Sequence, residues 1–231
     1  MKLFYLLLTP TLLLLISSCQ RRAAYQNPNF AEETKDHQLI AILPYQLEYT
    51  GNLPKDWTPE KEVSVRRDEA IQFQRSLMSQ LLQRTINRRS NYRVSFQSAN
   101  TTNTRLSAAD IKLVDSHLED PTRLAEILGV DAVVQATVIK ERYLSEEASL
   151  AIGVVDDILG QINRGNDLNL PRAGSRANTY SVDISVTLHD AVGQILYNDN
   201  TECNINWQTP PNEAVEKMNQ RISRSFPYLT K

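Results

Sequence analysis

Few residues of this chain have the types and spacing that catalysis requires. The histidines are His37, His117 and His189, and no two of them have metal-ligand spacing. No Gly-x-Ser-x-Gly motif, phosphate-binding glycine loop or zinc cluster is present. The carboxylate pairs Glu146-Glu147 and Asp156-Asp157 are adjacent, so on a helix their members point about 100° apart, which suits capping and solvation better than acid–base chemistry. A hydrolase is therefore the least favoured class, and no cofactor or metal is expected.

The clearest chemical signature lies at Cys19. Lys2 precedes an apolar segment from Leu3 to Ile16, and Ser17-Ser18 then places small residues directly before the cysteine. The segment is too short for a membrane-spanning helix, and small residues before a cleavage point indicate processing. The Ile-Ser-Ser-Cys ending resembles a bacterial lipobox, which implies removal of residues 1–18 and lipidation of Cys19. An ordinary secretory signal with an incidental cysteine is the alternative.

Lipidation would determine where the protein resides. Several acyl chains on Cys19 would give a stable anchor, because a single chain holds only marginally. Known lipoproteins imply that an aspartate after the cysteine would retain the protein on the inner membrane, and this chain has Gln20 there. We therefore expect an outer-membrane anchor with the body in the periplasm, while surface exposure stays open. Acylation would leave Cys203 as the only free thiol, so an intramolecular disulfide is not expected.

Composition limits the remaining classes. Residues 19–231 suffice for one domain with its own core. The formal net charge of the whole chain is −2, so no global field indicates nucleic acid as a partner. Arginines nevertheless recur from Arg66 to Arg93, and Arg84, Arg88 and Arg89 crowd the end of a predicted helix, where the helix dipole favours cations. This cluster is either a well-solvated helix end or a site for anionic lipid, wall glycan or an acidic protein face.

A second interaction candidate is the predicted helix at 145–163. Its apolar stripe includes Val155 and Ile158, and Leu150 and Val154 extend the apolar surface beyond one stripe. A helix with apolar residues on more than one side needs a second burial surface. The sheet of the domain itself, a neighbouring subunit and the membrane stay open as that surface.

The elements that must position these residues alternate between strands and helices. Residues 19–36 lack periodicity and read as a flexible tether. The predicted order is then a strand at 37–45, a loop at 50–59, a helix at 66–89, a strand at 92–96, a short helix that a capping box at 107–110 opens and that ends at 118, a helix at 120–129, a strand at 130–139, the helix at 145–163, a loop at 164–178, a hairpin of 180–188 and 194–197, and a helix at 212–226. Trp57 in the first loop is either a lid over the core or an exposed contact.

Helix, glycine and then buried strand is the end of a βαβ-type crossover, and Gly129 occupies the glycine position of such a unit. We therefore predict one α/β domain over residues 37–231, with a mixed sheet in a three-layer arrangement, a β-hairpin near the end and a C-terminal helix. Residues 145–178 form a helical insert in this domain.

The sequence resembles the periplasmic α/β domain that the curli-secretion channel lipoproteins share with the penicillin-binding-protein activator lipoproteins. It also resembles other outer-membrane lipoproteins that are built on this domain. The resemblance rests on Ile40–Tyr45, on Leu124–Val134, and on Ile184–Asp190 followed by Gly193–Tyr197, and it spans about His37 to Phe226. It implies a non-enzymatic envelope role, with an envelope protein or further copies of the chain as partners.

Two departures from these families limit what the resemblance implies. Channel members insert membrane-crossing hairpins with strands of about ten alternating residues, whereas residues 145–163 have a helical period. Activators must reach the inner membrane, which a tether of residues 20–36 is too short to allow. We therefore expect an outer-membrane lipoprotein that acts as an assembly or protein-interaction module, without nucleic-acid or small-molecule substrate. The alternative is a subunit of an oligomeric envelope export channel.

Overall fold

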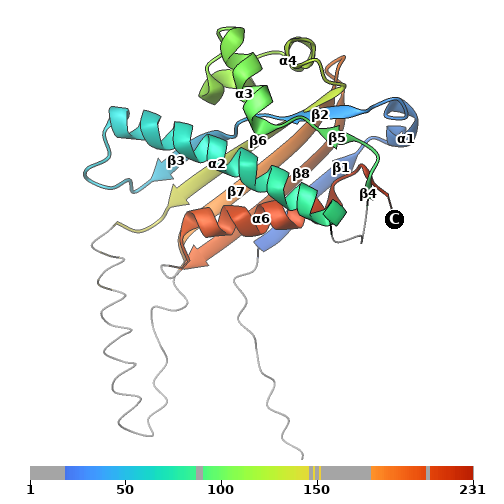
Figure 1. The fold of residues 1–231 in the computed structure, drawn as a ribbon. Helices are drawn as coiled ribbons and strands as arrows, with labels where there is room; N and C mark the ends of the chain where they lie inside the picture. The colour runs from blue at the N-terminus through green and yellow to red at the C-terminus, as the bar shows by residue number, and fades with distance from the viewer. Residues whose placement is uncertain are drawn as a thin grey trace, which may run out of the picture.

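The computed structural model describes residues 19–86, 91–145, 148, 151, 178–206 and 209–230. Within these ranges, seven strands form one mixed sheet in the order β1-β8-β7-β6-β2-β5, with β3 also paired to β6, and β4 pairs separately with β9 (Figure 1). Helices cover both faces, which confirms the predicted α/β class. None of the helices in the described ranges is long and apolar enough to span a bilayer.

The strands are β1 (Cys19–Gln26), β2 (Leu39–Ile42), β3 (Gln46–Gly51), β4 (Asn91–Tyr92), β5 (Ser95–Phe96), β6 (Ala132–Arg142), β7 (Asn178–Asp190), β8 (Ile195–Asn206) and β9 (Leu229–Thr230). The helices are α1 (Phe30–Glu33), α2 (Pro59–Ile86), α3 (Ala99–Ala108), α4 (Pro121–Leu128) and α6 (Pro211–Ser225), together with the 3-10 helix η1 (Leu113–Leu118).

The long antiparallel ladder of β6, β7 and β8 organises the domain. Alternate residues of β7 point to the core and are fully buried, from Val182 to Leu188, while the intervening polar residues point to the other face. The β7–β8 turn is closed by Asp190, whose carboxylate accepts hydrogen bonds from the backbone N–H groups of Val192 and Gln194. Gly193 takes a positive φ of 84° in this turn. The predicted hairpin is thus confirmed.

Helices α2 and α6 cross one face of this ladder (Figure 1), and their apolar residues, such as Phe73 and Met218, join the larger core cluster. On the opposite face, α3 and α4 cover β2 and the beginning of β6. Leu106 and Leu128 pack there against Val133 in a second cluster. The sheet therefore has helices on both faces, as expected for a three-layer arrangement.

Helix α4 follows its sequence signals closely. The Asp120 side chain caps the helix by accepting from the N–H groups of Thr122 and Arg123, and Pro121 occupies the first turn. Gly129 ends the helix in the left-handed region, with φ 57°. The helix–glycine–strand unit predicted at 120–139 is confirmed, although β6 continues to Arg142.

The predicted flexible tether at 19–36 is wrong. Cys19–Gln26 pairs antiparallel with β8, and α1 follows directly. Phe30 is only 4% exposed and packs edge-on against Tyr228 with the ring centroids 5.0 Å apart. The physical reason is the length of β8, which runs to Asn206 rather than ending at 197 and so offers a full strand edge for pairing. The described part of the domain therefore begins at Cys19, not at residue 37.

Other element boundaries also differ from those predicted. Helix α2 begins at Pro59 rather than 66, and β3 occupies residues 46–51, partly inside the predicted loop. The capping box predicted at 107–110 is wrong: α3 is capped by Ser98, whose hydroxyl accepts from the N–H of Thr101, and Ser107 lies in its last turn. The predicted helix at 145–163 and loop at 164–178 lie almost entirely outside the described residues.

Candidate interaction site

Within the described residues, strand β3 has a free edge, because β6 is its only partner strand there. It pairs in parallel with β6 from Gln46 opposite Thr137 to Gly51 opposite Arg142. Asn52 donates its N–H to the carbonyl of Arg142, and successive residues of a strand turn their backbone groups to opposite edges. The backbone groups of Leu47 and Tyr49 therefore point away from β6. Among the described residues, no group forms a hydrogen bond with them on that side.

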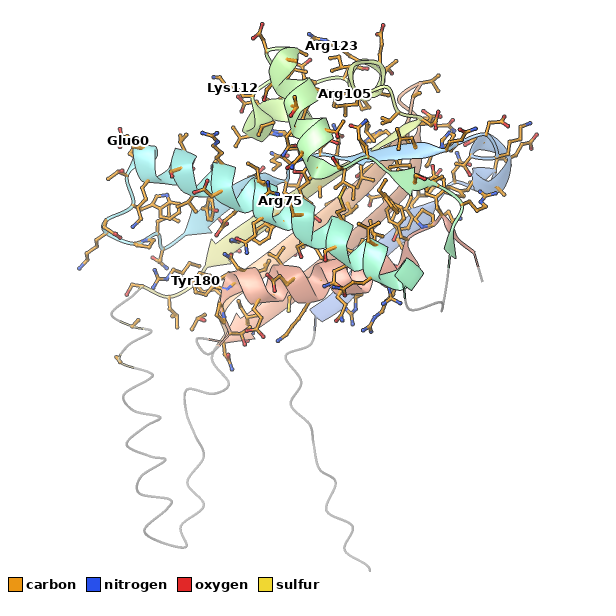
Figure 2. All side chains as sticks on the ribbon, viewed as in Figure 1. Glu60, Arg75, Arg105, Lys112, Arg123 and Tyr180 are labelled. Carbon is orange, nitrogen blue, oxygen red and sulfur yellow. The ribbon has the colours of Figure 1, made fainter. Side chains whose placement is uncertain are left out.

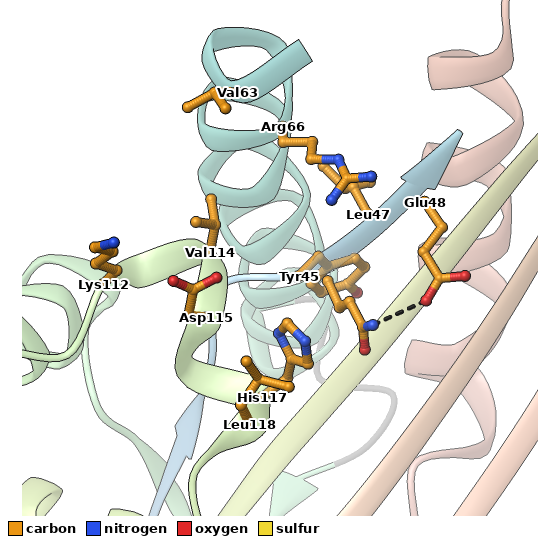
Figure 3. Close-up of a pocket in the computed structure, with 11 residues that line it drawn as sticks. Tyr45, Leu47, Glu48, Val63, Arg66, Lys112, Val114, Asp115, His117 and Leu118 are labelled. Carbon is orange, nitrogen blue, oxygen red and sulfur yellow. Dashed lines mark hydrogen bonds between the residues drawn. The ribbon is translucent and has the colours of Figure 1, made fainter. Parts of the chain in front are cut away.

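A cavity of about 450 Å³ lies along this edge, between β3, η1 and the first turns of α2 (Figure 3). Tyr45 and Leu47 contribute its buried apolar wall, and both are almost completely shielded from solvent. Val63 of α2 and Leu118 of η1 line it from the opposite elements and are 64% and 74% exposed. The cavity thus combines unpaired strand backbone with exposed apolar side chains, and we call it the β3-edge groove.

Charged groups of both signs line the β3-edge groove. Glu48 accepts a hydrogen bond of 2.9 Å from the Gln46 amide, the dashed line in Figure 3, and Arg66 forms an ion pair with Glu62 on its own helix. Burial lowers the pKa of His117, and the backbone of Val114 opposes this shift. Within the described residues, no hydrogen bond joins His117 to a hydroxyl, thiol or carboxylate. The groove therefore has the composition of a contact surface and lacks a nucleophile–base pair.

A second cavity, of about 310 Å³, lies at the other side of β3, where β6 ends. Lys140 of β6 projects beneath α2 and is 5% exposed. Its ammonium pairs with Glu69 of α2, donates to the Asn212 side chain of α6 at 2.6 Å, and lies over the rings of Tyr49 and Phe73. Burial lowers the pKa of Lys140, and the Glu69 carboxylate opposes that shift. Sequence reasoning missed this group.

A signal for Lys140 was present in the sequence. The inward positions of β6 alternate through Ala132, Val134, Ala136 and Val138, and Lys140 is the next in that series. A lysine on the buried face of a strand needs a partner. Glu69 could not be identified as that partner without the fold, because 71 positions separate the two residues.

Only one of the residues that the sequence predicted to mediate interactions lies within the described part of the chain. The Arg84 guanidinium donates to the Ser223 hydroxyl at 3.3 Å and so links α2 to α6. Arg88 and Arg89 lie outside the described residues, as do Leu150, Val154, Val155 and Ile158, so these predictions stay untested. Arg84 lines neither of the two cavities.

The three histidines make separate contacts. His37 shares a hydrogen bond of 2.7 Å with the Tyr228 hydroxyl, which joins the segment before β2 to the residue before β9. His189 contacts the carbonyl of Gly193 inside the hairpin turn. Burial lowers the pKa of both histidines. In the part of the chain that is described, no three His, Cys, Asp or Glu side chains gather as metal ligands do.

Cys203 departs from expectation. It lies in β8, as predicted, and is buried, but it is disulfide-bonded rather than a free thiol. The β1–β8 register places Cys19, the only other cysteine of the sequence, directly opposite. One sulfur cannot carry both a lipid thioether and a disulfide. Lipidation of Cys19 and this disulfide therefore exclude each other within one molecule.

No protein-family model and no curated protein sequence matches the chain. Similar solved structures include lipoprotein GNA1162 from Neisseria meningitidis (12% identity, TM-score 0.38, covering 81% of this chain and 94% of that one). The PelC dodecamer from Paraburkholderia phytofirmans has 10% identity and a TM-score of 0.40, over 89% and 96% of the two chains. The LpoB C-terminal domain from Salmonella enterica has 8% identity and a TM-score of 0.34, over 77% and 94%. Similarities this distant carry no functional assignment.

Proposed function

We propose that this chain is a lipid-anchored outer-membrane protein whose periplasmic α/β domain acts as a non-enzymatic protein-interaction module. The partner supplies an extended segment that pairs with the free edge of β3. The observation that carries this proposal is the β3-edge groove, where unpaired backbone groups of Leu47 adjoin exposed Val63 and Leu118. The lipobox at Cys19 supports the anchor, and in the anchored form Cys203 keeps its thiol, because lipidation of Cys19 and the disulfide exclude each other.

An extended polypeptide fits this groove better than other occupants. Adding a strand to a sheet edge gives main-chain hydrogen bonds, and alternate side chains of the added strand enter neighbouring pockets. Val63 and Leu118 offer apolar contacts for such side chains, while Arg66, Lys112 and Glu48 leave the rim polar and able to pair charges of either sign. An open edge with apolar neighbours would otherwise invite aggregation.

Site-specific photo-crosslinking in intact cells tests this proposal. A photoreactive residue at Leu118, which is 74% exposed, is compared with one at Val192, which is similarly exposed at 77% but lies on the β7–β8 turn. We expect one discrete adduct from position 118 and none from position 192. Val63→Asp should abolish that adduct without changing the amount of protein in the membrane fraction.

The identity of the adduct separates the possible occupants. Mass spectrometry should locate the crosslink in an extended segment of a different envelope protein. A crosslink to a second copy of this chain would contradict a heterologous partner and show that the groove mediates self-association. Equal adducts from positions 118 and 192, or none from either, would contradict the use of the groove.

A further inference from the structure

The second cavity has features that protein–protein contact through the β3-edge groove does not use. Two rows of residues cross its floor. In the first, Tyr49 of β3 lies opposite Lys140 of β6; in the second, Gly51 of β3 and Tyr180 of β7 flank Arg142 of β6. Residues two apart in a strand share a face and lie about 7 Å apart. Lys140 and Arg142 therefore both line the cavity from β6.

Arg142 has no anionic partner among the described residues. Its guanidinium lies over the Tyr180 ring, 5.6 Å from the centroid, and its Nε is buried without a hydrogen-bond acceptor. A buried donor without an acceptor is unfavourable and marks a place where an acceptor is missing. On the other flank, Gly51 adds no side chain, and a Cβ there would lie 2.2 Å from the Arg142 carbonyl oxygen.

Among the described residues that line the cavity, the charges leave one cation uncompensated. Lys140 is neutralised by Glu69, which also accepts a hydrogen bond of 2.5 Å from the Tyr49 hydroxyl. Asn212 accepts from Lys140 as well. Of the charged residues that are described in the lining, Arg142 therefore remains as a net single positive charge. A monoanion balances this charge, whereas a dianion would also be repelled by the Glu69 carboxylate.

The remaining walls are apolar and aromatic. Trp57 packs over Tyr49 with the ring centroids 5.0 Å apart, and its indole N–H donates to Glu62, so the ring is held in place. Leu53 and Pro54 line the same side, and Pro210 and Pro211 line the side of α6. A mostly apolar cavity with a few polar groups is typical of a small-ligand site, and about 310 Å³ is near the lower end of such volumes.

We propose that this cavity binds a carboxylate carried on an apolar body about the size of one amino-acid residue. The planar guanidinium of Arg142 holds the carboxylate in a two-point contact, which matches its geometry. The apolar body packs against Trp57, Tyr49 and the prolines. A purely structural role at the domain end accounts for the Lys140–Glu69 pair but not for Arg142. The carboxylate comes either from a free small acid or from the C-terminal residue of a polypeptide.

Calorimetric titration of the full chain in a nonionic detergent tests the proposal. The probes are a hexapeptide ending in Phe with a free carboxylate, the same peptide amidated at its C-terminus, and 3-phenylpropionate. We expect the amidated peptide to bind at least about tenfold more weakly than the acid, because the charged contact to Arg142 is lost. Binding of the acid peptide and the amide with equal affinity, or of neither acid, would overturn the proposal.

Substitutions of Arg142 test whether this residue makes the contact to the carboxylate. Arg142→Gln should weaken binding of the acid about tenfold or more. Arg142→Lys should weaken it less, because lysine keeps the positive charge but loses the two-point contact of the guanidinium. Arg123→Gln is the matched control, since Arg123 lies on α4 away from this cavity (Figure 2) and should leave affinity unchanged. Unaltered affinity in Arg142→Gln would overturn the assignment. The acid–amide comparison uses the wild-type chain and so does not depend on folding of the variant. Tighter binding of the peptide than of 3-phenylpropionate indicates a polypeptide C-terminus, and the reverse indicates a free acid.

Discussion

Lys140 of β6 and Glu69 of α2 form an ion pair nearly sealed from water, with side-chain exposures of 5% and 15%. The pair ties the end of the central strand to the helix that crosses it. Each charge lost its hydration on folding, and each is compensated by the other and by neutral partners, Asn212 for the lysine and Tyr49 for the glutamate. Removing one member leaves the other charge buried without its counter-charge.

Glu69→Gln should therefore lower the free energy of unfolding by about 3 kcal/mol or more, because Lys140 keeps its buried charge. Lys140→Met should cost less, since Glu69 keeps the Tyr49 donor and is the more exposed member. The double variant should lose less than Glu69→Gln alone. Urea unfolding of the four proteins measures these differences.

The control for this cycle is the exposed pair Lys217–Glu213 on α6, with side-chain exposures of 57% and 50%. Lys217→Met should change the free energy of unfolding by no more than about 1 kcal/mol. Comparable losses from both pairs would show that Lys140 and Glu69 are hydrated in solution.

Stability should fall on mild acidification. Burial lowers the pKa values of His37, His117 and His189 below 6.5 in the folded chain. At pH values between those lowered pKa values and 6.5, the unfolded chain binds more protons than the folded one. The free energy of unfolding is therefore highest above about pH 6.5 and decreases as the pH falls through that window. Urea midpoints at pH 7.5 and pH 5.5 measure the decrease. His37→Gln should reduce it, and a midpoint independent of pH would contradict the burial of these rings.

Cys19→Ala should release the protein from the membrane fraction and abolish labelling by radioactive palmitate, because the lipobox places the acyl chains on this residue. A lipid on Cys19 excludes the disulfide to Cys203 that the structure shows, so the anchored wild-type chain should carry one free thiol, Cys203, when it is denatured without reductant and treated with a maleimide. Wild-type protein that takes up no palmitate and shows no thiol would instead favour the disulfide over the anchor.

Leu128→Ala should cost about 2–5 kcal/mol in the free energy of unfolding, as expected for a fully buried leucine. Leu128 lies in the last turn of α4 and packs in the second core cluster, and its carbonyl also accepts from the Gln97 side chain. Thermal or urea unfolding measures the loss. A change of less than about half a kilocalorie per mole would mean that this site relaxes without a cavity.

Local signals predicted some elements well. Helix α4 has a capping Asp120, a first-turn proline and a terminal Gly129, and each acts where the sequence places it. Helix α3 was missed because ANTTNTRLSA is mostly polar and its buried positions, Ala99, Thr102 and Leu106, include a threonine. Strand β3 was missed because it is short and follows Pro44 after one residue, although Gln46 to Tyr49 alternate between polar and apolar types.

The candidate sites depend on contacts that no local pattern contains. Cys19 and the lipobox can be recognised within a few residues. In contrast, the β3-edge groove joins β3 to η1 and α2, and the cavity at Arg142 joins segments from Tyr49 to Asn212. Sheet register creates these neighbours, and a register cannot be deduced from alternation alone. The predicted tether failed for the same reason, because its partner strand β8 lies far along the sequence.

The N-terminal segment packs on the domain and should contribute to its stability. Phe30 is buried against Tyr228, and β1 covers the edge of β8. Phe30→Ala should cost about 3–5 kcal/mol in the free energy of unfolding, whereas Tyr25→Ala, at a residue 48% exposed, should cost well under half as much. Deleting residues 19–36 should cost at least as much as Phe30→Ala and expose the β8 edge to self-association. Equal urea midpoints for the deleted and intact chains would mean that residues 19–36 form a flexible tether and that β1 does not stabilise the domain.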